Sequence, residues 1–101
     1  MVVKTHEAAQ AIYESDWKAY LTGPGFEGVI YGCSWAWRDA ALALATTKAE
    51  KVAINEAHLK RMQELDKLER KKEPVGFLGG EYVTEYYVAE AESFLAKAKG
   101  E

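Results

Sequence analysis

Apolar side chains recur every three or four residues along most of this 101-residue chain, and short runs rich in glycine and proline interrupt them. This spacing places apolar side chains on one face of an α-helix, whereas a half-buried strand would alternate apolar and polar residues. The interruptions are Thr-Gly-Pro-Gly at residues 22–25 and Glu-Pro-Val-Gly-Phe-Leu-Gly-Gly at residues 73–80. Proline cannot continue a helix, and glycine weakens one by about 1 kcal/mol. We therefore predict helices joined by short turns.

The first and last segments carry the clearest helical stripes. The predicted buried face of the first helix consists of Ala9, Ile12, Tyr13, Trp17, Tyr20 and Leu21. The predicted buried face of the last helix consists of Val83, Tyr86, Tyr87, Ala91, Phe94, Leu95 and Ala98. Both segments leave charged residues on the opposite side, as amphipathic helices do.

Residues 26–33 fit either a helix or a strand. Their apolar positions follow a helical stripe, yet Gly28 and Gly32 weaken a helix, and Val-Ile-Tyr at 29–31 suits a strand. A strand needs a partner, and the only other β-rich run, residues 81–88, fits the last helix better. We therefore predict a helix over 26–45. The alternative is an α+β fold in which 26–32 pairs with 81–88.

The helix over 26–45 would carry the only cysteine and two of the three tryptophans. Its stripe is expected to pack on neighbouring helices and consists of Cys33, Trp37, Ala40, Ala41 and Leu44, extended by Phe26, Val29 and Ile30. Apolar surroundings raise the pKa of a thiol, so we expect Cys33 to be structural. Trp35 lies roughly 160° from Trp37 around a helix, so one ring fills a second interface or faces outward.

Residues 47–72 form a long third helix in this prediction. Thr47 and Glu50 have the spacing of a capping box, so the chain either breaks near residue 46 or continues from the preceding helix as one rod. Beyond Glu50 apolar residues are sparse, and charged pairs four residues apart favour an exposed helix. We predict one all-α domain over 1–101, a small antiparallel bundle of about four helices with one long, partly exposed helix.

Few residues suit catalysis or metal binding. Cys33 is predicted to be buried, and His6 and His58 are expected to be solvated surface side chains. The histidines lack a metal-ligand spacing, and there is no second cysteine. The glycine-bearing turns lack the G-x-G-x-x-G and Walker patterns of phosphate loops. We therefore expect a protein that is not an enzyme and that uses no cofactor or metal.

A basic surface is one candidate for binding. Residues 51–73 hold seven basic and five acidic residues, and Lys60, Lys67 and Lys71 share one side of the third helix. The interleaved acids favour a solvated face, because phosphate contacts reward cations that no acid neutralises. The net charge of the whole chain, -3, also argues against a general nucleic-acid binder.

Acidic and aromatic side chains near the last helix are the second candidate. The acidic stripe is Glu81, Glu85 and Glu92, and the aromatic candidates are Trp35, Phe77 and Tyr82. Tyrosine and tryptophan are frequent anchors in protein interfaces. We therefore expect a protein partner that the aromatic side chains anchor, while the acidic stripe selects a basic surface.

The location is expected to be cytoplasmic. One cysteine allows no intrachain disulfide, which is typical of a reducing compartment. The most apolar run, residues 29–45, contains Arg38 and Asp39 and is shorter than a membrane span. The first residues, MVVKTHEAAQ, lack the apolar run of a secretory signal.

Helical segments rich in tryptophan, alanine and arginine, such as residues 31–45, are similar to those of small accessory proteins of bacteriophages. The resemblance implies a non-enzymatic inhibitor or adaptor that occupies a partner's surface, including a nucleic-acid-binding surface. One alternative is a nucleic-acid-binding transcriptional regulator, acting as a homodimer through the Lys60 to Lys72 face. Another is a structural subunit of an assembly, which would self-associate.

Overall fold

The computed structural model describes residues 2–23, 25–72 and 82–100. They form four α-helices, α1 (Val2–Thr22), α2 (Glu27–Leu44), α3 (Lys48–Lys72) and α4 (Val83–Gly100), and no strand occurs in these ranges. The all-α prediction is therefore confirmed. The alternative with a strand over 26–32 is wrong, because packing stabilises α2 despite its two glycines: Ile30 is only 1% exposed.

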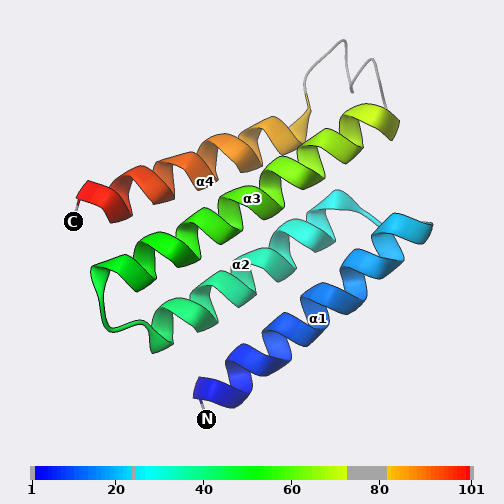
Figure 1. Cartoon of the computed structure of the whole chain (residues 1–101). Helices are drawn as coiled ribbons and strands as arrows, with labels where there is room; N and C mark the ends of the chain where they lie inside the picture. The colour runs from blue at the N-terminus through cyan, green and yellow to red at the C-terminus, as the bar shows by residue number, and fades with distance from the viewer. Residues whose placement is uncertain (1, 24, 73–81, 101) are drawn as a thin grey trace.

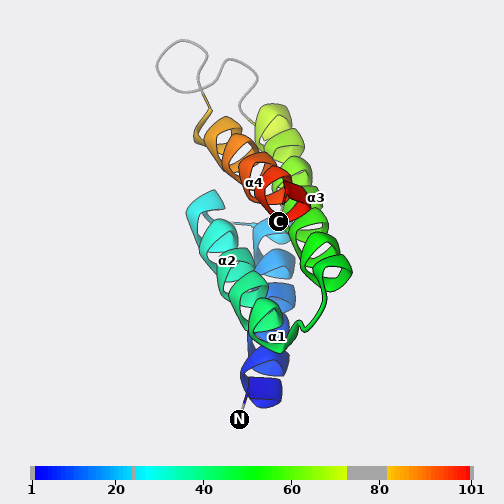
Figure 2. The ribbon, with the colours of Figure 1, turned by 90° about the vertical axis from the view of Figure 1, so that its left-hand side faces the viewer.

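The helices lie side by side in chain order, with α2 and α3 in the middle and α1 and α4 on the outside (Figure 1). Consecutive helices run antiparallel, as short connections favour. The view turned by 90° shows two pairs, α1 with α2 and α3 with α4 (Figure 2). No described helix has the length and apolarity of a membrane span.

Local geometry explains two of the connections. After α1, Gly25 approaches the chain so closely that a Cβ atom on it would lie 2.7 Å from Tyr20 Cα, so only glycine fits. Between α2 and α3, the Thr47 hydroxyl oxygen accepts a hydrogen bond from the backbone N–H of Glu50 (3.1 Å). This cap starts a new helix, and α2 and α3 are therefore two separate helices.

The core lies where the four helices face one another. Its buried residues are Tyr13 and Tyr20 of α1, Ile30 of α2, Met62 and Leu65 of α3, and Tyr87 and Ala91 of α4. The predicted stripes are too wide, because several of their members are exposed: Ile12, Leu21, Phe26, Val29, Leu44, Val83 and Tyr86. The reason is that α1 and α4 have neighbours on one side only, and one side of α2 faces away from the other helices.

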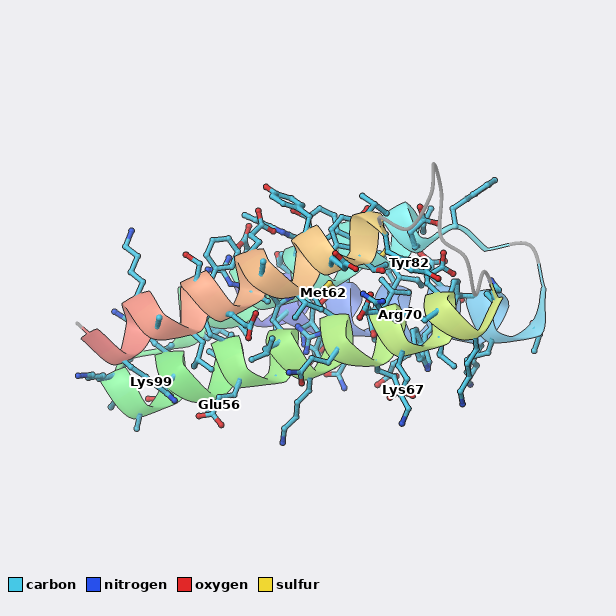
Figure 3. All side chains as sticks on the ribbon, turned by 90° about the horizontal axis from the view of Figure 1, so that it is seen from above. Glu56, Met62, Lys67, Arg70, Tyr82 and Lys99 are labelled. Atoms are coloured by element: carbon cyan, nitrogen blue, oxygen red, sulfur yellow. The ribbon has the colours of Figure 1, made fainter. Side chains whose placement is uncertain are left out.

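α3 is the long, partly exposed helix that the sequence predicts. Glu56 and Lys67 point outward from it, whereas Met62 points into the bundle (Figure 3). Two polar side chains of α3 are nevertheless buried, since Asn55 is 3% exposed and His58 is 0% exposed. The expectation of a solvated His58 is therefore wrong: position 58 lies four residues before Met62 and shares its inward face.

Candidate functional site

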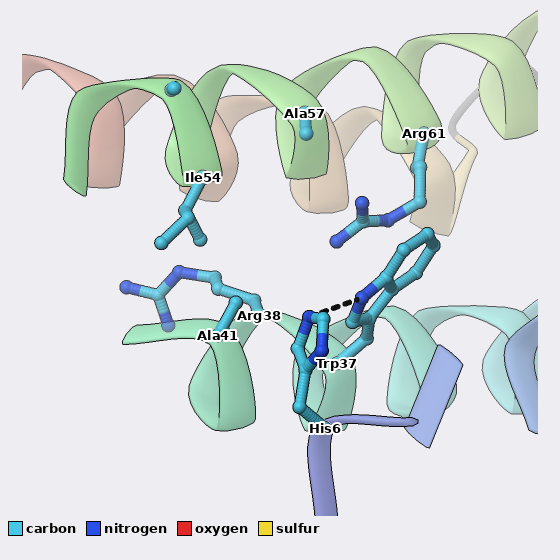
Figure 4. A pocket seen from close by; sticks show the side chains of 8 residues that line it. His6, Trp37, Arg38, Ala41, Ile54, Ala57 and Arg61 are labelled. Carbon is cyan, nitrogen blue, oxygen red and sulfur yellow. Dashed lines mark hydrogen bonds between the residues drawn. The ribbon is translucent and has the colours of Figure 1, made fainter. Parts of the chain in front are cut away.

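A groove opens between the start of α1 and the facing sides of α2 and α3 (Figure 4). It encloses about 240 Å³, and the small side chains of Ala41, Ala53 and Ala57 leave this space between α2 and α3. The lining residues that the structure describes are His6, Trp37, Arg38, Ala41, Ala53, Ile54, Ala57 and Arg61. Alanine, isoleucine and tryptophan make most of the lining apolar, and basic side chains border it.

A second hollow continues this groove toward the connection between α2 and α3. The residues common to both hollows are His6, Ala41, Ala53 and Ile54. The extension is completed by Leu44, Ala45 and Glu50. We call the two hollows together the Arg61 groove, after the residue that gives the inner end its charge.

Arg61 is held rigidly at the groove. Its Nε donates to Ser34 Oγ (2.6 Å), and its guanidinium lies 4.3 Å from the centroid of the Trp37 ring and 5.5 Å from that of Tyr13. Burial lowers the pKa of Arg61 to about 10, against an opposing effect of the Tyr13 phenol, so the group stays charged at neutral pH. No ion pair among the described residues involves Arg61. A half-buried cation here therefore has no carboxylate partner in the described chain.

His6 joins α1 to α2 at the groove. Its Nε2 accepts a hydrogen bond from Trp37 Nε1–H (3.2 Å), marked in Figure 4, so the proton of the neutral ring is on Nδ1. The one carboxylate among the described lining residues, Glu50, belongs to the extension, where two threonine hydroxyls donate to it. The inner end of the groove thus presents positive charge without a carboxylate among its described lining residues, which complements an anion.

A serine and a histidine form a buried pair next to Arg61. Ser34 Oγ and His58 Nδ1 are 2.8 Å apart, and both side chains are 0% exposed. Burial and then the charges of Arg61 and Arg38 lower the pKa of His58 to about 4, so the ring is neutral at neutral pH. The pair resembles a nucleophile with its base, but it is closed to solvent. In this structure it links α2 to α3.

Trp35, a predicted partner anchor, is half-buried between α2 and α4. Its Nε1 donates to Glu90 Oε1 (3.1 Å), and its ring meets the Phe94 ring edge-on with centroids 5.2 Å apart. Tyr31 donates to the same oxygen (2.6 Å) and Tyr86 to the other (3.2 Å). Burial alone would raise the pKa of Glu90, but these hydrogen bonds hold it below its ordinary value. Trp35 thus fills a second helix interface.

The other predicted partner residues separate into different contacts. Glu85 is exposed and accepts a hydrogen bond from Arg70 Nη2 (2.6 Å), and the Arg70 guanidinium lies 4.5 Å from the centroid of the Tyr82 ring (Figure 3). Glu92 is exposed on α4. Phe77 and Glu81 lie outside the described residues. Arg70 therefore brings Tyr82 and Glu85 together, and the charge of Glu85 is partly neutralised.

Only some of the basic residues in the predicted basic surface are exposed cations outside the described ion pairs. Lys60, Lys67 and Lys71 are exposed on α3, and no ion pair in the described ranges involves them. The other basic residues of this stretch are engaged elsewhere, because Arg61 borders the groove and Arg70 pairs with carboxylates. Lysines and exposed glutamates alternate on the outer side of α3, as the sequence indicates.

Cys33 lies where α1 meets α2. Its Sγ donates to Asp16 Oδ2 (3.0 Å), and the residue is half-buried. Burial and then the Asp16 carboxylate raise the pKa of the thiol to about 11, which confirms the expected direction. The thiol is therefore protonated at neutral pH and is a weak nucleophile. In the described part of the chain, His, Cys, Asp and Glu side chains form no cluster suited to a metal ion.

Comparisons with protein-family models, curated proteins and solved structures found no match. The functional argument therefore depends on the residues of this chain. The sequence analysis counted Arg61 only as one of the seven basic residues of 51–73 and did not find the groove. The groove is the candidate site because it combines an accessible apolar lining with the positive charge of Arg61. In the part of the chain that the structure describes, no carboxylate forms an ion pair with Arg61.

Proposed function

We propose that this protein binds another macromolecule without catalysing a reaction, and that the Arg61 groove receives a segment in which a carboxylate lies beside apolar side chains. One observation carries the proposal: the Arg61 guanidinium borders an apolar groove, and no ion pair in the described chain involves it. A charge withdrawn from water without a partner is costly, and a carboxylate can pair with a guanidinium through two parallel hydrogen bonds.

The rest of the lining favours the same kind of segment. Ile54 and the Trp37 ring offer apolar contact, which contributes roughly 25 cal/mol per Å² of apolar area removed from water. Arginine and tryptophan are also the residue types that most often dominate binding energy in protein interfaces. A glutamate or aspartate flanked by leucine or phenylalanine matches this combination of charge and apolar surface.

An accessory or inhibitory role, as the sequence suggests, would follow if the bound segment belongs to a working surface of the partner. In this proposal the groove takes over the anchoring role expected of Trp35. The Trp35 indole N–H is already bonded to Glu90, and its ring already contacts Phe94. Glu92 stays available on α4 as an exposed acidic group that favours a basic surface nearby.

The test uses short peptides with glutamate between leucine and phenylalanine, each paired with a version in which glutamine replaces the glutamate. Binding is followed by tryptophan fluorescence, because Trp37 lines the groove. We expect the glutamate peptides to bind about tenfold more tightly, since a charge-assisted hydrogen bond contributes roughly 1.5–3 kcal/mol. Equal affinity for the two sets, or no binding by either, would contradict the proposal.

Ala57→Glu is the sharpest variant for this test. Ala57 lines the groove four residues before Arg61, so a glutamate there fills the space and offers Arg61 a carboxylate from within the chain. Ala89→Glu is the matched control, because Ala89 is also exposed but is not among the residues that line the groove. We expect peptide binding to be lost in Ala57→Glu alone. Equal loss in both variants, or in neither, would assign binding to another surface.

Nucleic-acid binding is the second candidate function, favoured by the exposed Lys60, Lys67 and Lys71. It predicts an affinity for duplex DNA that falls steeply with salt and disappears when all three lysines are replaced by glutamine. The groove proposal predicts that this triple variant keeps its peptide binding. DNA binding that the triple variant loses and Ala57→Glu keeps, without any peptide binding, would make the outer side of α3 the functional surface.

A further inference from the structure

A cavity larger than either hollow of the Arg61 groove lies between α2, α3 and α4. Its residues belong to the end of the bundle where α3 begins and α4 ends, and Figure 1 shows these helix ends side by side. The cavity encloses about 400 Å³. Its basic lining residues come from three helices: Arg38 from α2, Lys51 from α3 and Lys97 from α4. Asn55 and Phe94 also line it, and no carboxylate is among the described lining residues.

The charges around this cavity are only partly balanced. Arg38 pairs with the exposed Asp39 (Nη1 to Oδ1, 3.1 Å). No ion pair within the described ranges involves Lys51 or Lys97. Like charges gathered around one space repel one another, and the repulsion is strongest where water is partly excluded. The Arg38 side chain is only 12% exposed, so an anion in the cavity would relieve an unfavourable arrangement.

Arg38 is held in place for such a ligand. Its Nε donates to Asn55 Oδ1 (2.8 Å), and its guanidinium lies 4.0 Å from the centroid of the Phe94 ring. Asn55 is itself fixed, because its Nδ2 donates to the backbone oxygen of Lys51 (2.8 Å). Within the part of the chain that the structure describes, Nη2 of Arg38 makes no hydrogen bond, whereas Nε and Nη1 do. A guanidinium fixed in this way loses little freedom when it binds an anion.

We propose that this cavity binds a phosphate group, either free phosphate or the phosphate of a small monoester. A phosphate monoester carries about two negative charges near neutral pH, which matches three surrounding cations better than a single carboxylate does. The planar guanidinium of Arg38 can bind two phosphate oxygens, and the ammonium groups of Lys51 and Lys97 act as mobile point charges. The cavity shares Arg38 with the lining of the Arg61 groove, but Arg61 does not line the cavity, and the proposal does not depend on the function proposed above.

The experiment titrates the full-length protein with inorganic phosphate and with phenyl phosphate, at constant ionic strength maintained with chloride. We expect saturable binding with a Kd below about 1 mM, seen as a rise in Tm and as a shift of the Asn55 side-chain NMR signals. Tighter binding of phenyl phosphate would assign the site to an organic monoester, and tighter or equal binding of inorganic phosphate would assign it to the free anion. No saturable response up to about 10 mM of either compound would overturn the proposal.

Lysine variants separate this site from general attraction of anions. Lys97→Gln and Lys51→Gln are each expected to weaken phosphate binding about tenfold, as one lost charge-assisted contact implies. Lys99→Gln is the control, because Lys99 is exposed on α4, the helix that carries Lys97, and does not line the cavity (Figure 3). Both Lys97 and Lys51 are exposed, so their replacement leaves the core intact. Equal effects of Lys97→Gln, Lys51→Gln and Lys99→Gln would refute the site.

Discussion

An arginine lies on each side of α2, and the two have different surroundings: Arg38 faces α4, and Arg61 lies at the groove beside α1. Burial lowers the pKa of Arg38, but Asp39 and Glu90 oppose this, and Lys51 and Lys97 share its cavity. Arg61 lies on the other side, in a groove lined mostly by alanine, isoleucine and tryptophan, and forms no ion pair with a described residue. Our two proposals follow from this difference in surroundings: a small polyanion as the ligand at Arg38, and an acidic and apolar segment at Arg61.

The two sides of α2 also differ in how many of their polar and charged groups have partners within the described chain. On the α4 side, the Glu90 carboxylate accepts hydrogen bonds from Tyr31, Trp35 and Tyr86, so its polar groups are satisfied within the chain. On the other side, Arg61 is fixed by Ser34 and by aromatic rings, but its charge stays unneutralised by the described residues. We therefore expect changes on the α4 side to affect stability first and changes at the groove to affect binding first.

Lowering the pH should destabilise the packing on both sides of α2, because His58 lies between Arg38 and Arg61. This is the largest effect that we expect. The pKa of His58 is about 4 in the folded chain and 6.5 in the unfolded chain, so only the unfolded chain takes up a proton between these values. The free energy of unfolding therefore decreases as the pH falls from 6.5 to 4, by up to about 3 kcal/mol. Denaturant unfolding at a series of pH values measures this loss.

The control for this experiment compares two histidine variants. His58→Gln removes the titrating group and should lose most of the pH dependence between pH 6.5 and 4. His6→Gln should keep it, because this variant retains His58. The same pH dependence in the original chain and in His58→Gln would show that His58 is not held in its neutral form by the fold.

Glu90→Leu tests the closed side of α2 alone. It leaves the Tyr31 hydroxyl and the Trp35 indole N–H without their acceptor, and an unsatisfied buried donor costs about 1–3 kcal/mol. Because both donors are half-buried, we expect the free energy of unfolding to decrease by about 1–2 kcal/mol. Glu92→Leu, two positions along the same helix on an exposed site, is expected to have little effect. Similar losses in the two variants would argue that Glu90 does not organise the α2–α4 interface.

Two glycine variants with opposite expected signs test the packing of α1 and α2 outside the groove. Gly25→Ala places a Cβ atom 2.7 Å from Tyr20 Cα, so the turn that positions α1 must shift, and we expect about 1–3 kcal/mol of destabilisation. Gly32→Ala meets nothing within 4 Å on the outer side of α2 and should stabilise the helix by about 0.5–1 kcal/mol. Thermal unfolding measures both. Destabilisation by Gly32→Ala would show that the outer side of α2 is packed against something.

Most of the fold follows from the sequence because the helical spacing is local. The stripes and the turn residues predict four helices, and the Thr47–Glu50 cap marks one of their starts. The width of each stripe is not local, since it depends on how many neighbours a helix has. This is why Phe26 and Tyr86 are exposed although their spacing fits the buried face.

The candidate site is harder to predict, because residues of three helices form it. Arg61 carries a detectable signal: it lies three residues after His58 and four before Leu65, and both of these are buried. A polar residue in a buried stripe is easily assigned to the surface when its residue type is given more weight than its position in the helical pattern. The groove itself has no local signal, because alanines far apart in the sequence must face one another to leave the space.

The central claim, that Arg61 and Arg38 serve different ligands, is tested most directly by NMR of the guanidinium groups in protein labelled with ¹⁵N-arginine. The glutamate-containing peptide should shift the Nε and Nη signals of Arg61 more than those of Arg38, which also lines the groove but bonds to Asn55 and Asp39. Inorganic phosphate should shift the signals of Arg38 and leave those of Arg61 in place. A larger shift of the same arginine by both ligands, or no shift by either ligand, would contradict the account.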